Sequence, residues 1–265
     1  MKKWILTIFL LFLLVFVVVG LSRPLTLTEY SISNPRIPDS YDGYRIAVVS
    51  DLHAERFGAD QGDLIAMLLA SDCDLICFIG DLVSFNTADF SPVWELIDSL
   101  PGIPMVYAAG NNELSMNQYE DFLSELRSRG VTVLDEDVLP IDNGADRILI
   151  HGYPFRDSRQ FGGCLPVSEK GFYNILLYHD PYCFQEAAAL DYDLMLSGHI
   201  HGGVVRLPLL GSPLEWLNME PYTRGLYTGR AATLIVSGGL GSNSVLPRFF
   251  SAPEVVLVTL NASNS

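Results

Sequence analysis

Two histidines one residue apart, His199 and His201, lie between glycines directly after the apolar run 194–196. Imidazole is the commonest side-chain metal ligand in proteins, and glycine lets the backbone turn sharply beside such a group. The pair alone is weak evidence, because neighbouring histidines often bind nothing. The chain has five histidines in all, and we expect the other three to stand at strand ends as well: His53, His151 and His179.

Two carboxylates and an amide share this position after predicted strands. In α/β sheets ligands bind beyond the carboxyl ends of the strands, so these side chains are candidate metal ligands. One ion does not need so many ligands, whereas two ions that share a carboxylate do. Mixed nitrogen and oxygen ligands suit Mn, Fe, Co or Zn better than Ca or Mg. The candidate metal ligands are Asp51, His53, Asp81, Asn111, His179, His199 and His201.

Such a pair of ions would define the chemistry. Two divalent ions about 3.5–4 Å apart clamp the attacking and leaving oxygens of a phosphoryl displacement. A water between them should ionise near neutral pH and become the nucleophile. The sequence therefore indicates hydrolysis of a phosphate ester through a hydroxide held by two metals.

Alternating strands and helices must position these residues, which predicts an α/β domain. The expected helices cover 63–70, 93–100, 118–129 and 182–190. The part after residue 202 is rich in strands and poor in helices, which suggests a second sheet packed on the first. The expected strands cover 45–50, 74–79, 104–108, 131–134, 139–141, 147–151, 173–178, 193–196, 233–236 and 254–260.

The first segment is a membrane signal. Residues 4–21 carry no charge and follow Lys2 and Lys3, and a helix of this length spans about 27 Å at 1.5 Å per residue. We expect residues 1–22 to form an uncleaved anchor, with a cleaved signal peptide as the alternative. The positive-inside rule then places the lysines in the cytoplasm and the rest of the chain outside the cell membrane. Residues 23–43, rich in Pro, Ser and Thr, read as a linker or an edge strand.

Composition limits the partners. Formal net charge is −15 over 265 residues, which argues against nucleic acid, because that binding depends on neutralising phosphates with Lys and Arg. A phosphate-ester substrate remains compatible, since bound divalent ions reverse the field locally. Four cysteines in an exported domain allow disulfides, although Cys77 reads as a small buried hydrophobe.

Five motifs occur in a fixed order, each after a predicted strand: Asp51-x-His53, Gly80-Asp81, Gly110-Asn111, His179 and Gly198-His199-x-His201. In this order they resemble the calcineurin-like metallophosphoesterases over residues 45–205. The remainder looks like the membrane-anchored bacterial branch of that family, which includes enzymes similar to UDP-2,3-diacylglucosamine pyrophosphohydrolases. The resemblance implies a four-layer αββα sandwich, two mixed β-sheets flanked by helices, for a domain spanning 44–262.

The resemblance also implies a role for each residue. Asp51, His53 and His201 would hold the first metal. Asp81 would bridge the two ions. The second ion would be held by Asn111, His179 and His199.

One position departs from the family pattern. The family's Gly-Asn-His-Glu/Asp motif reads Gly110-Asn111-Asn112-Glu113 here. Asn112 replaces the histidine that contacts the substrate phosphate and assists the leaving oxygen. An amide donates a hydrogen bond but is no general acid near neutral pH, and general acid–base catalysis contributes about 10²–10⁴-fold. We therefore expect a slower enzyme, with Asn112 still contacting substrate.

Three further residues have open roles. Arg206 would contact either the substrate phosphate or a partner acid. His151 is a weak candidate for the missing imidazole, and a structural role is the better interpretation. Glu113 is expected to support the site rather than to bind metal.

Three functional hypotheses follow. The first is a metal-dependent phosphoesterase acting on a phosphodiester, phosphomonoester or pyrophosphate, and a lipid-linked or envelope substrate would fit the anchor. The second is a catalytically weakened metal-binding module that holds a phosphorylated ligand, as the change at Asn112 suggests. The third is a structural membrane protein without bound metal.

Overall fold

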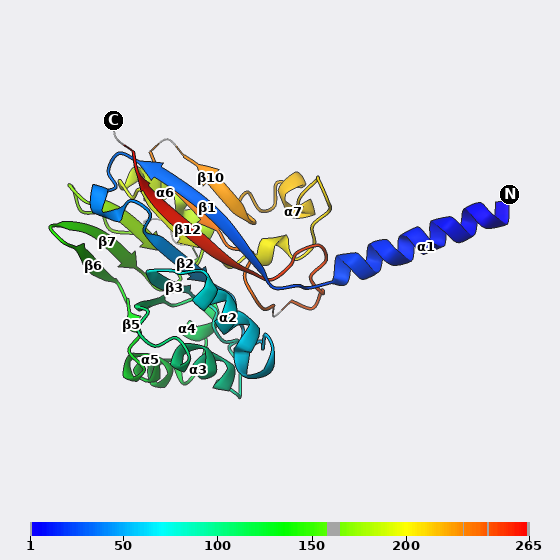
Figure 1. The fold of residues 1–265 in the computed structure, drawn as a ribbon, viewed down its shortest axis with the longest axis horizontal. Coiled ribbons are helices and arrows are strands. Elements are labelled where there is room, and N and C mark those ends of the chain that lie inside the picture. Colours follow the sequence, from blue (N-terminus) through cyan, green and yellow to red (C-terminus); the bar gives the residue numbers. More distant parts are fainter. Residues whose placement is uncertain (1, 158–164, 230, 243, 264–265) are drawn as a thin grey trace.

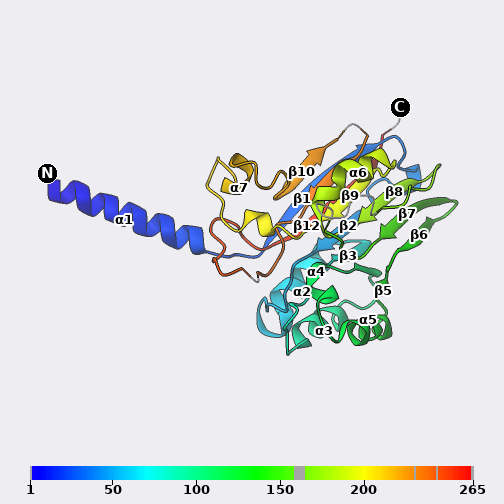
Figure 2. The ribbon, with the colours of Figure 1, turned by 180° about the vertical axis from the view of Figure 1, so that it is seen from behind.

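A computed structural model of the chain describes residues 2–157, 165–229, 231–242 and 244–263. Two six-stranded sheets, A and B, face each other at its centre (Figures 1 and 2). In spatial order, sheet A contains β1 (Thr26–Asn34), β12 (Glu254–Ala262), β2 (Arg45–Val49), β3 (Leu75–Ile79), β4 (Met105–Ala108) and β5 (Thr132–Val133). Sheet B contains β10 (Gly225–Thr228), β11 (Thr233–Val236), β9 (Leu194–Ser197), β8 (Tyr173–Leu177), β7 (Asp146–Gly152) and β6 (Asp137–Asn143).

Both sheets are mixed. In sheet A, β2 to β5 run parallel, and β12 is antiparallel to β2 while parallel to β1. In sheet B, the strands from β11 to β7 run parallel, and β10 and β6 add antiparallel edges. The parallel strands of each sheet therefore end at one common edge.

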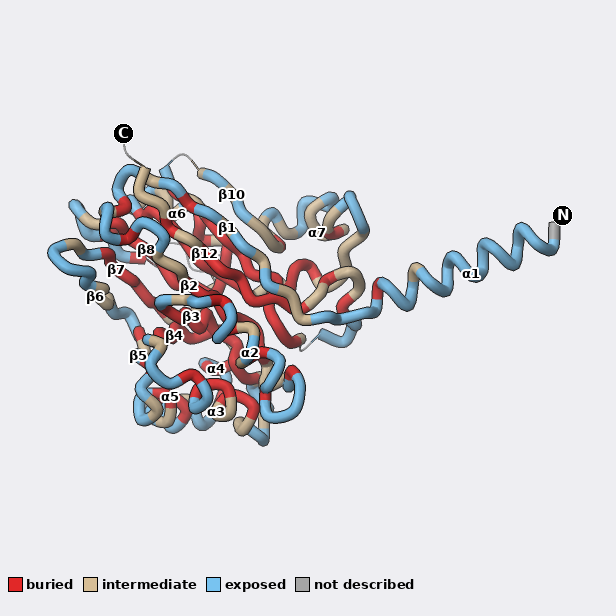
Figure 3. Tube along the Cα trace, viewed as in Figure 1, coloured by how far each residue is buried: buried red, intermediate tan, exposed pale blue. Residues whose placement is uncertain are grey.

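Alternation of side chains along each strand builds the layers. On β2, Ile46 and Val48 point into the core between the sheets, together with Ile150 and Leu196 of sheet B. The opposite face of β2 packs under helices on the outer side of sheet A. Figure 3 shows the resulting buried interior.

Among the described residues, three helices cover the outer face of sheet A and one covers sheet B. α2 (Gly62–Ala70), α3 (Ser91–Asp98) and α5 (Tyr119–Ser128) pack on sheet A through Leu68, Leu96 and Phe122, among others. α6 (Phe184–Ala189) packs on sheet B. This arrangement confirms the predicted four-layer αββα sandwich. Two single-turn helices, α4 (Asn111–Leu114) and α7 (Pro213–Trp216), lie in loops.

The structure shows how the strands at the two ends of the domain pair. The strands after residue 202 do not form a sheet of their own: β10 and β11 extend sheet B, whereas β12 returns to sheet A. The predicted second sheet packed on the first is present, but the strands after residue 202 are divided between the two sheets. Strand density shows how many strands there are and not which neighbours they pair with. Of the two alternatives for residues 23–43, an edge strand is present, since β1 pairs with β12 along its whole length.

α1 (Lys2–Leu21) projects from the domain at the end opposite the β6–β7 hairpin (Figure 1). Over Lys3–Leu21 it is long and apolar enough to cross a membrane, and 6% of this stretch is buried. An apolar helix with so little contact to its own domain exposes a surface of the kind that marks an interaction site.

Candidate metal centre

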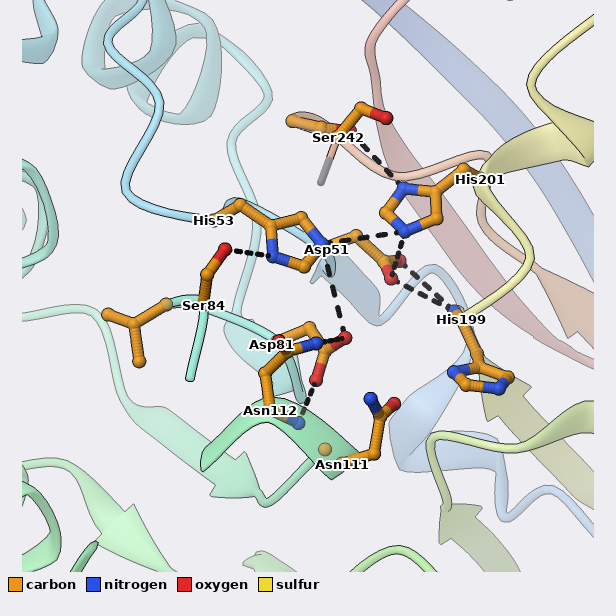
Figure 4. Close-up of polar contacts among 12 residues, drawn as sticks. Asp51, His53, Asp81, Ser84, Asn111, Asn112, His199, His201 and Ser242 are labelled. Carbon is orange, nitrogen blue, oxygen red and sulfur yellow. Dashed lines mark hydrogen bonds and ion pairs between the residues drawn. The ribbon is translucent and has the colours of Figure 1, made fainter. Parts of the chain in front are cut away.

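The candidate ligands lie in loops at the carboxyl ends of five strands (Figure 4). Asp51 and His53 follow β2, Asp81 follows β3, and Asn111 opens α4 just after β4. The histidines come from the opposite sheet: His179 follows β8, and both His199 and His201 follow β9. Because the two sheets face each other, loops far apart in sequence meet at one edge.

Six of the seven side chains form two groups. Asp51, His53 and His201 make one, and Asp81, His179 and His199 make the other. Within each group the ligand atoms lie within 4.8 Å of one another. Figure 4 places the amide of Asn111 between Asp81 and His199, next to the second group.

The two carboxylates face histidines of both groups. Asp81 Oδ2 lies 3.4 Å from His179 Nε2 and 3.9 Å from His53 Nε2. Asp51 Oδ1 lies 3.7 Å from His201 Nε2 and 3.8 Å from His179 Nε2. The groups are therefore contiguous, and a carboxylate can serve both.

The rings are oriented by contacts behind them. His179 Nδ1 lies 2.7 Å from the carbonyl of Ile79, to which it donates, so Nε2 faces the carboxylates. His53 Nδ1 lies 3.1 Å from Ser84 Oγ, and its Nε2 faces His201 Nε2 at 3.4 Å. Such contacts on the far nitrogen fix the ring orientation of metal-binding histidines.

Electrostatics favour a positive charge between the carboxylates. Burial lowers the pKa of His179, but Asp81 and Asp51 outweigh it and raise that pKa to about 10. Burial alone would raise the pKa of Asp81, yet His179 and His53 hold it well below its usual value. His201, facing less negative charge, has its pKa lowered by burial to about 4. The same field that protonates His179 would attract a divalent cation.

Five candidate ligands adopt a left-handed backbone conformation that non-glycine residues rarely use. Such residues cost of order 1–3 kcal/mol each and persist where the surrounding structure imposes them. Such strained residues cluster at active sites and ligand clamps. The residues are Asp51 (φ 52°), His53 (φ 51°), Asp81 (φ 54°), His199 (φ 77°) and His201 (φ 51°).

Two buried polar atoms in this cluster have no hydrogen-bond partner among the described residues. They are Oδ1 of Asn111 and Nε2 of His179. A buried polar group left unsatisfied costs about 1–3 kcal/mol, and coordination of an ion removes that cost. The donor set is nitrogen and oxygen, which suits first-row divalent ions. The residues therefore fit a pair of divalent metal ions.

Asn112 is engaged with Asp81. Its backbone N–H donates to Asp81 Oδ1 at 2.9 Å, and its Nδ2 donates to Oδ2 at 2.6 Å. Its Oδ1 accepts from the backbone N–H of Phe85 at 3.2 Å, and the residue is buried. In this arrangement the amide orients Asp81.

Glu113 supports the same loops from beneath. The carboxylate is fully buried and accepts N–H bonds from Asp81 (2.9 Å), Val83 (3.2 Å) and Gly110 (3.0 Å). Burial and the nearby Asp81 charge raise its pKa to about 7. It holds together the ends of β3 and β4.

The remaining predicted residues lie apart from the two groups. Arg206 donates to the carbonyl of Gly202 at 3.0 Å and lies 3.5 Å from Glu215 Oε1, so it contacts a partner acid. His151 lies inside β7 rather than at its end, and its Nε2 lies 2.8 Å from Asn174 Oδ1. His151 is buried on the outer side of sheet B and contacts Asn174 there. The weak interpretation as a replacement imidazole was therefore wrong, and the structural interpretation is supported.

Sequence reasoning missed Arg248. This guanidinium is almost completely buried and donates to the carbonyls of Gly238 (2.7 Å), Gly241 (3.1 Å from Nε) and His201 (3.4 Å). Burial lowers its pKa to about 10, so it stays charged at neutral pH. A single charge inside the otherwise apolar run 245–250 was the available signal.

Comparison with known proteins adds a family match: the model of the calcineurin-like phosphoesterases matches residues 44–203. An uncharacterized metallophosphoesterase of Bacillus subtilis (strain 168), YkuE, is 27% identical over 254 residues, covering 89% of this chain and 86% of its own length. Phosphodiesterase YaeI of Escherichia coli (strain K12) is 29% identical over 230 residues, covering 84% of each chain. A "transmembrane protein with metallophosphoesterase domain" of Danio rerio is 25% identical over 273 residues, covering 94% of this chain and 60% of its own.

Proposed function

Because the chain belongs to the calcineurin-like phosphoesterase family, we propose that it hydrolyses phosphodiesters of the cell envelope. The family consists of metal-dependent phosphoric ester hydrolases with dinuclear centres, and this chain is such a hydrolase. The observation that carries the proposal is the contact between the two ligand groups through Asp81 and Asp51. The E. coli relative is named a phosphodiesterase, which favours a diester over a monoester or a pyrophosphate.

The ligand assignment is part of the proposal. Asp51, His53 and His201 would hold one ion, with Asp81 shared between the two sites. When bound, the ions supply Lewis-acid chemistry: they lower the pKa of water and stabilise charge on the phosphoryl oxygens. Manganese, iron, zinc and cobalt all match the donors. The second ion would be held by Asn111, His179 and His199.

The chain's own polar groups set the leaving-group requirement. Asn112 keeps Asp81 oriented through two hydrogen bonds, and this amide has no acidic proton to give near neutral pH. Among diesters, one whose leaving oxygen needs little protonation is therefore preferred. We propose that Asn112 still lines the phosphate subsite. Arg206 is an unfavourable candidate for phosphate contact, since Glu215 and Gly202 already engage it.

The proposed position of the protein at the membrane limits the class of substrate that it can reach. We propose that residues 1–22 anchor the protein in the cell membrane as a single span, with domain 44–262, extended by β1, on the extracytoplasmic side. The apolar helix and the relatives named as transmembrane proteins support the anchor. Lys2 and Lys3 before the helix support the orientation. A lipid-linked phosphate ester would be within reach of such an enzyme.

The test uses the full chain, purified in detergent and loaded with Mn²⁺. Hydrolysis of bis-p-nitrophenyl phosphate is measured beside D81A, and bound metal is counted in both. We expect turnover and about two ions per chain in the parent, with turnover lost in D81A. Two bound ions without turnover on diester, monoester or pyrophosphate would refute the hydrolase.

One observation keeps the metal-binding module in consideration: no general acid stands at Asn112. N112H separates the two hypotheses. A slow enzyme should gain up to about 10²–10⁴-fold on substrates with poor leaving groups and little on p-nitrophenyl esters. A binding module should show no turnover before or after the change.

A further inference from the structure

The domain exposes a large apolar surface beside the base of α1. Two segments form it, residues 205–219 with α7 and residues 244–250, and we call them the apolar collar. Leu209 and Val245 are 105% and 101% exposed, so they touch almost nothing. Exposed apolar patches of this kind mark interaction sites. The large exposed side chains of the collar are Leu209, Leu210, Trp216, Leu217, Met219, Val245 and Leu246.

The collar presents almost no free charge, although the chain as a whole carries −15. Its two segments contain three charged residues: Arg206, Glu215 and Arg248. Arg206 and Glu215 pair with each other at 3.5 Å. Arg248 is buried and bonded to backbone carbonyls. A charge-balanced apolar surface on an acidic protein fits a lipid interface better than an ionic partner.

α1 packs directly on the collar. The Phe16 ring lies 5.7 Å from that of Phe249 and 5.0 Å from that of Phe250, centroid to centroid. The N–H of Phe250 donates to the carbonyl of Gly20 at 2.6 Å. A Cβ at Gly20 would lie 2.3 Å from the Phe249 ring, so glycine permits this close approach.

These contacts fix the level of the collar along α1. Phe16 lies five residues before Leu21, the last residue of the helix, or about 7.5 Å along its axis. The collar therefore overlaps the final turn and a half of the apolar helix instead of standing clear of it. Figures 1 and 2 show α7 and the neighbouring loops at the end of the domain from which α1 leaves.

We propose that the apolar collar docks into the interfacial layer of the bilayer that α1 crosses. Irregular loops do not enter the hydrocarbon centre, because their backbone groups would lose hydrogen bonds. They are tolerated in the headgroup and upper acyl region, where apolar side chains insert about 5–10 Å and tryptophan is enriched. The indole N–H of Trp216 donates to the carbonyl of Leu210, so its ring enters without an unsatisfied donor.

Docking would also bring the metal centre to the membrane surface. The collar begins four residues after His201, and Arg206 N donates to Phe249 O at 2.8 Å. The hydroxyl of Ser251, just beyond the collar, donates to the carbonyl of His201 at 3.2 Å. The His199–His201 loop and the collar thus form one hydrogen-bonded unit. Resting on the proposed phosphodiesterase activity, this placement assigns the substrate class: a diester whose phosphate lies at headgroup depth, attached to a membrane lipid.

The first experiment measures depth without requiring activity. The full chain is placed in phosphatidylcholine–phosphatidylglycerol vesicles, with and without brominated acyl chains that quench tryptophan. W4F removes the indole of α1 and leaves two others: Trp216, and Trp94 of α3, which packs on Phe122 of α5. W4F/W216F provides the background for L209W and for the control A145W, whose exposed site lies in the distant β6–β7 turn.

We expect brominated lipid to quench Trp216 and the L209W indole strongly and to leave A145W at background. An L209W signal as unaffected as that of A145W would overturn the docking, and so would equal quenching of both.

The second experiment tests the substrate class. L209E/V245E places two charges on exposed collar positions and touches no candidate ligand. Hydrolysis of bis-p-nitrophenyl phosphate should be unchanged. Hydrolysis of the p-nitrophenyl ester of phosphatidic acid, embedded in the same vesicles, should fall several-fold. Equal rates on the embedded ester would overturn the assigned substrate class. If the parent hydrolyses neither ester, the proposed activity fails, and the quenching experiment still decides the docking.

Discussion

Glu113 offers the sharpest test of how the metal centre is built, through the substitution E113Q. Three buried backbone N–H groups, from Asp81, Val83 and Gly110, share its carboxylate. Glutamine has nearly the same shape but only one acceptor oxygen, so one N–H must face an amide NH₂. Losing that bond inside the protein costs about 1–3 kcal/mol. The two bonds that remain lose the contribution of the negative charge.

One effect opposes this loss. Burial, and then the nearby charge of Asp81, raise the pKa of Glu113 to about 7. A neutral side chain at this position therefore relieves some repulsion from Asp81. Measurements at pH 8, above that pKa, compare the ionised glutamate with the amide. We expect a net destabilisation of about 1–3 kcal/mol, and a melting temperature lowered by about 2–4 °C per kcal/mol in a chain of this size. Loosening the Asp81 loop should weaken metal binding about 10–100-fold, as residues behind metal ligands usually do.

The assay is thermal unfolding of the full chain in detergent, with and without Mn²⁺, followed by metal titration. E125Q is the matched control, since it removes the same charge from a partly exposed pair with Arg129 at the surface, and surface pairs contribute about 0–1 kcal/mol. If E113Q melts and binds metal as E125Q does, the loops are held by other contacts and the argument for Glu113 fails.

Three further perturbations test the site. G198A should abolish turnover and weaken metal binding, because the new Cβ would lie 2.5 Å from Asp51 Oδ2, whereas G62A, with nothing within 4 Å, should leave both unchanged; equal activity of the two would contradict the steric argument. R248M should lower stability by about 3 kcal/mol or more, as several buried carbonyls lose their donor, and should weaken metal binding through His201; an unchanged urea midpoint would disprove this. Removing metal with EDTA should lower the melting temperature, and Mn²⁺ should restore it in proportion to the logarithm of its excess over the dissociation constant; calorimetric scans that coincide would exclude a structural contribution of the ions.

The order and type of the elements around the centre follow from local sequence. Strand β3, for example, is a continuous apolar run bounded by Asp74 and Gly80, as a buried parallel strand should be. The pattern cannot specify pairing. β12 pairs antiparallel with β2, about two hundred residues away in sequence. Nothing in the sequence of either strand indicates that the other is its partner. The assignment of the last strands to two different sheets was out of reach for this reason.

The candidate ligands could be found because metal chemistry restricts residue type, and five short motifs preserve it in order. The residues that support these ligands from behind could not be found in the same way. Glu113 and Arg248 act through backbone groups of distant loops, and any chain offers backbone groups everywhere. Only burial distinguishes such a side chain from a solvated one, and burial is a property of the fold. The left-handed conformations of Asp51 and His53 are equally invisible, because neither residue is a glycine.

If position 112 is catalytic, as we propose, the contacts of Asn112 show how its surroundings accommodate an amide there. An imidazole at this position could form a hydrogen bond to Asp81 with one ring nitrogen and to a substrate with the other. The NH₂ of the Asn112 amide donates to Asp81, and its oxygen accepts from the N–H of Phe85. Both ends of the side chain therefore form hydrogen bonds within the protein. The exchange leaves the carboxylate oriented while the proton donor is lost. Transition-state stabilisation must then come from the ions and from the leaving group itself, which is why the choice of leaving group, more than metal affinity, should govern the rate of this enzyme.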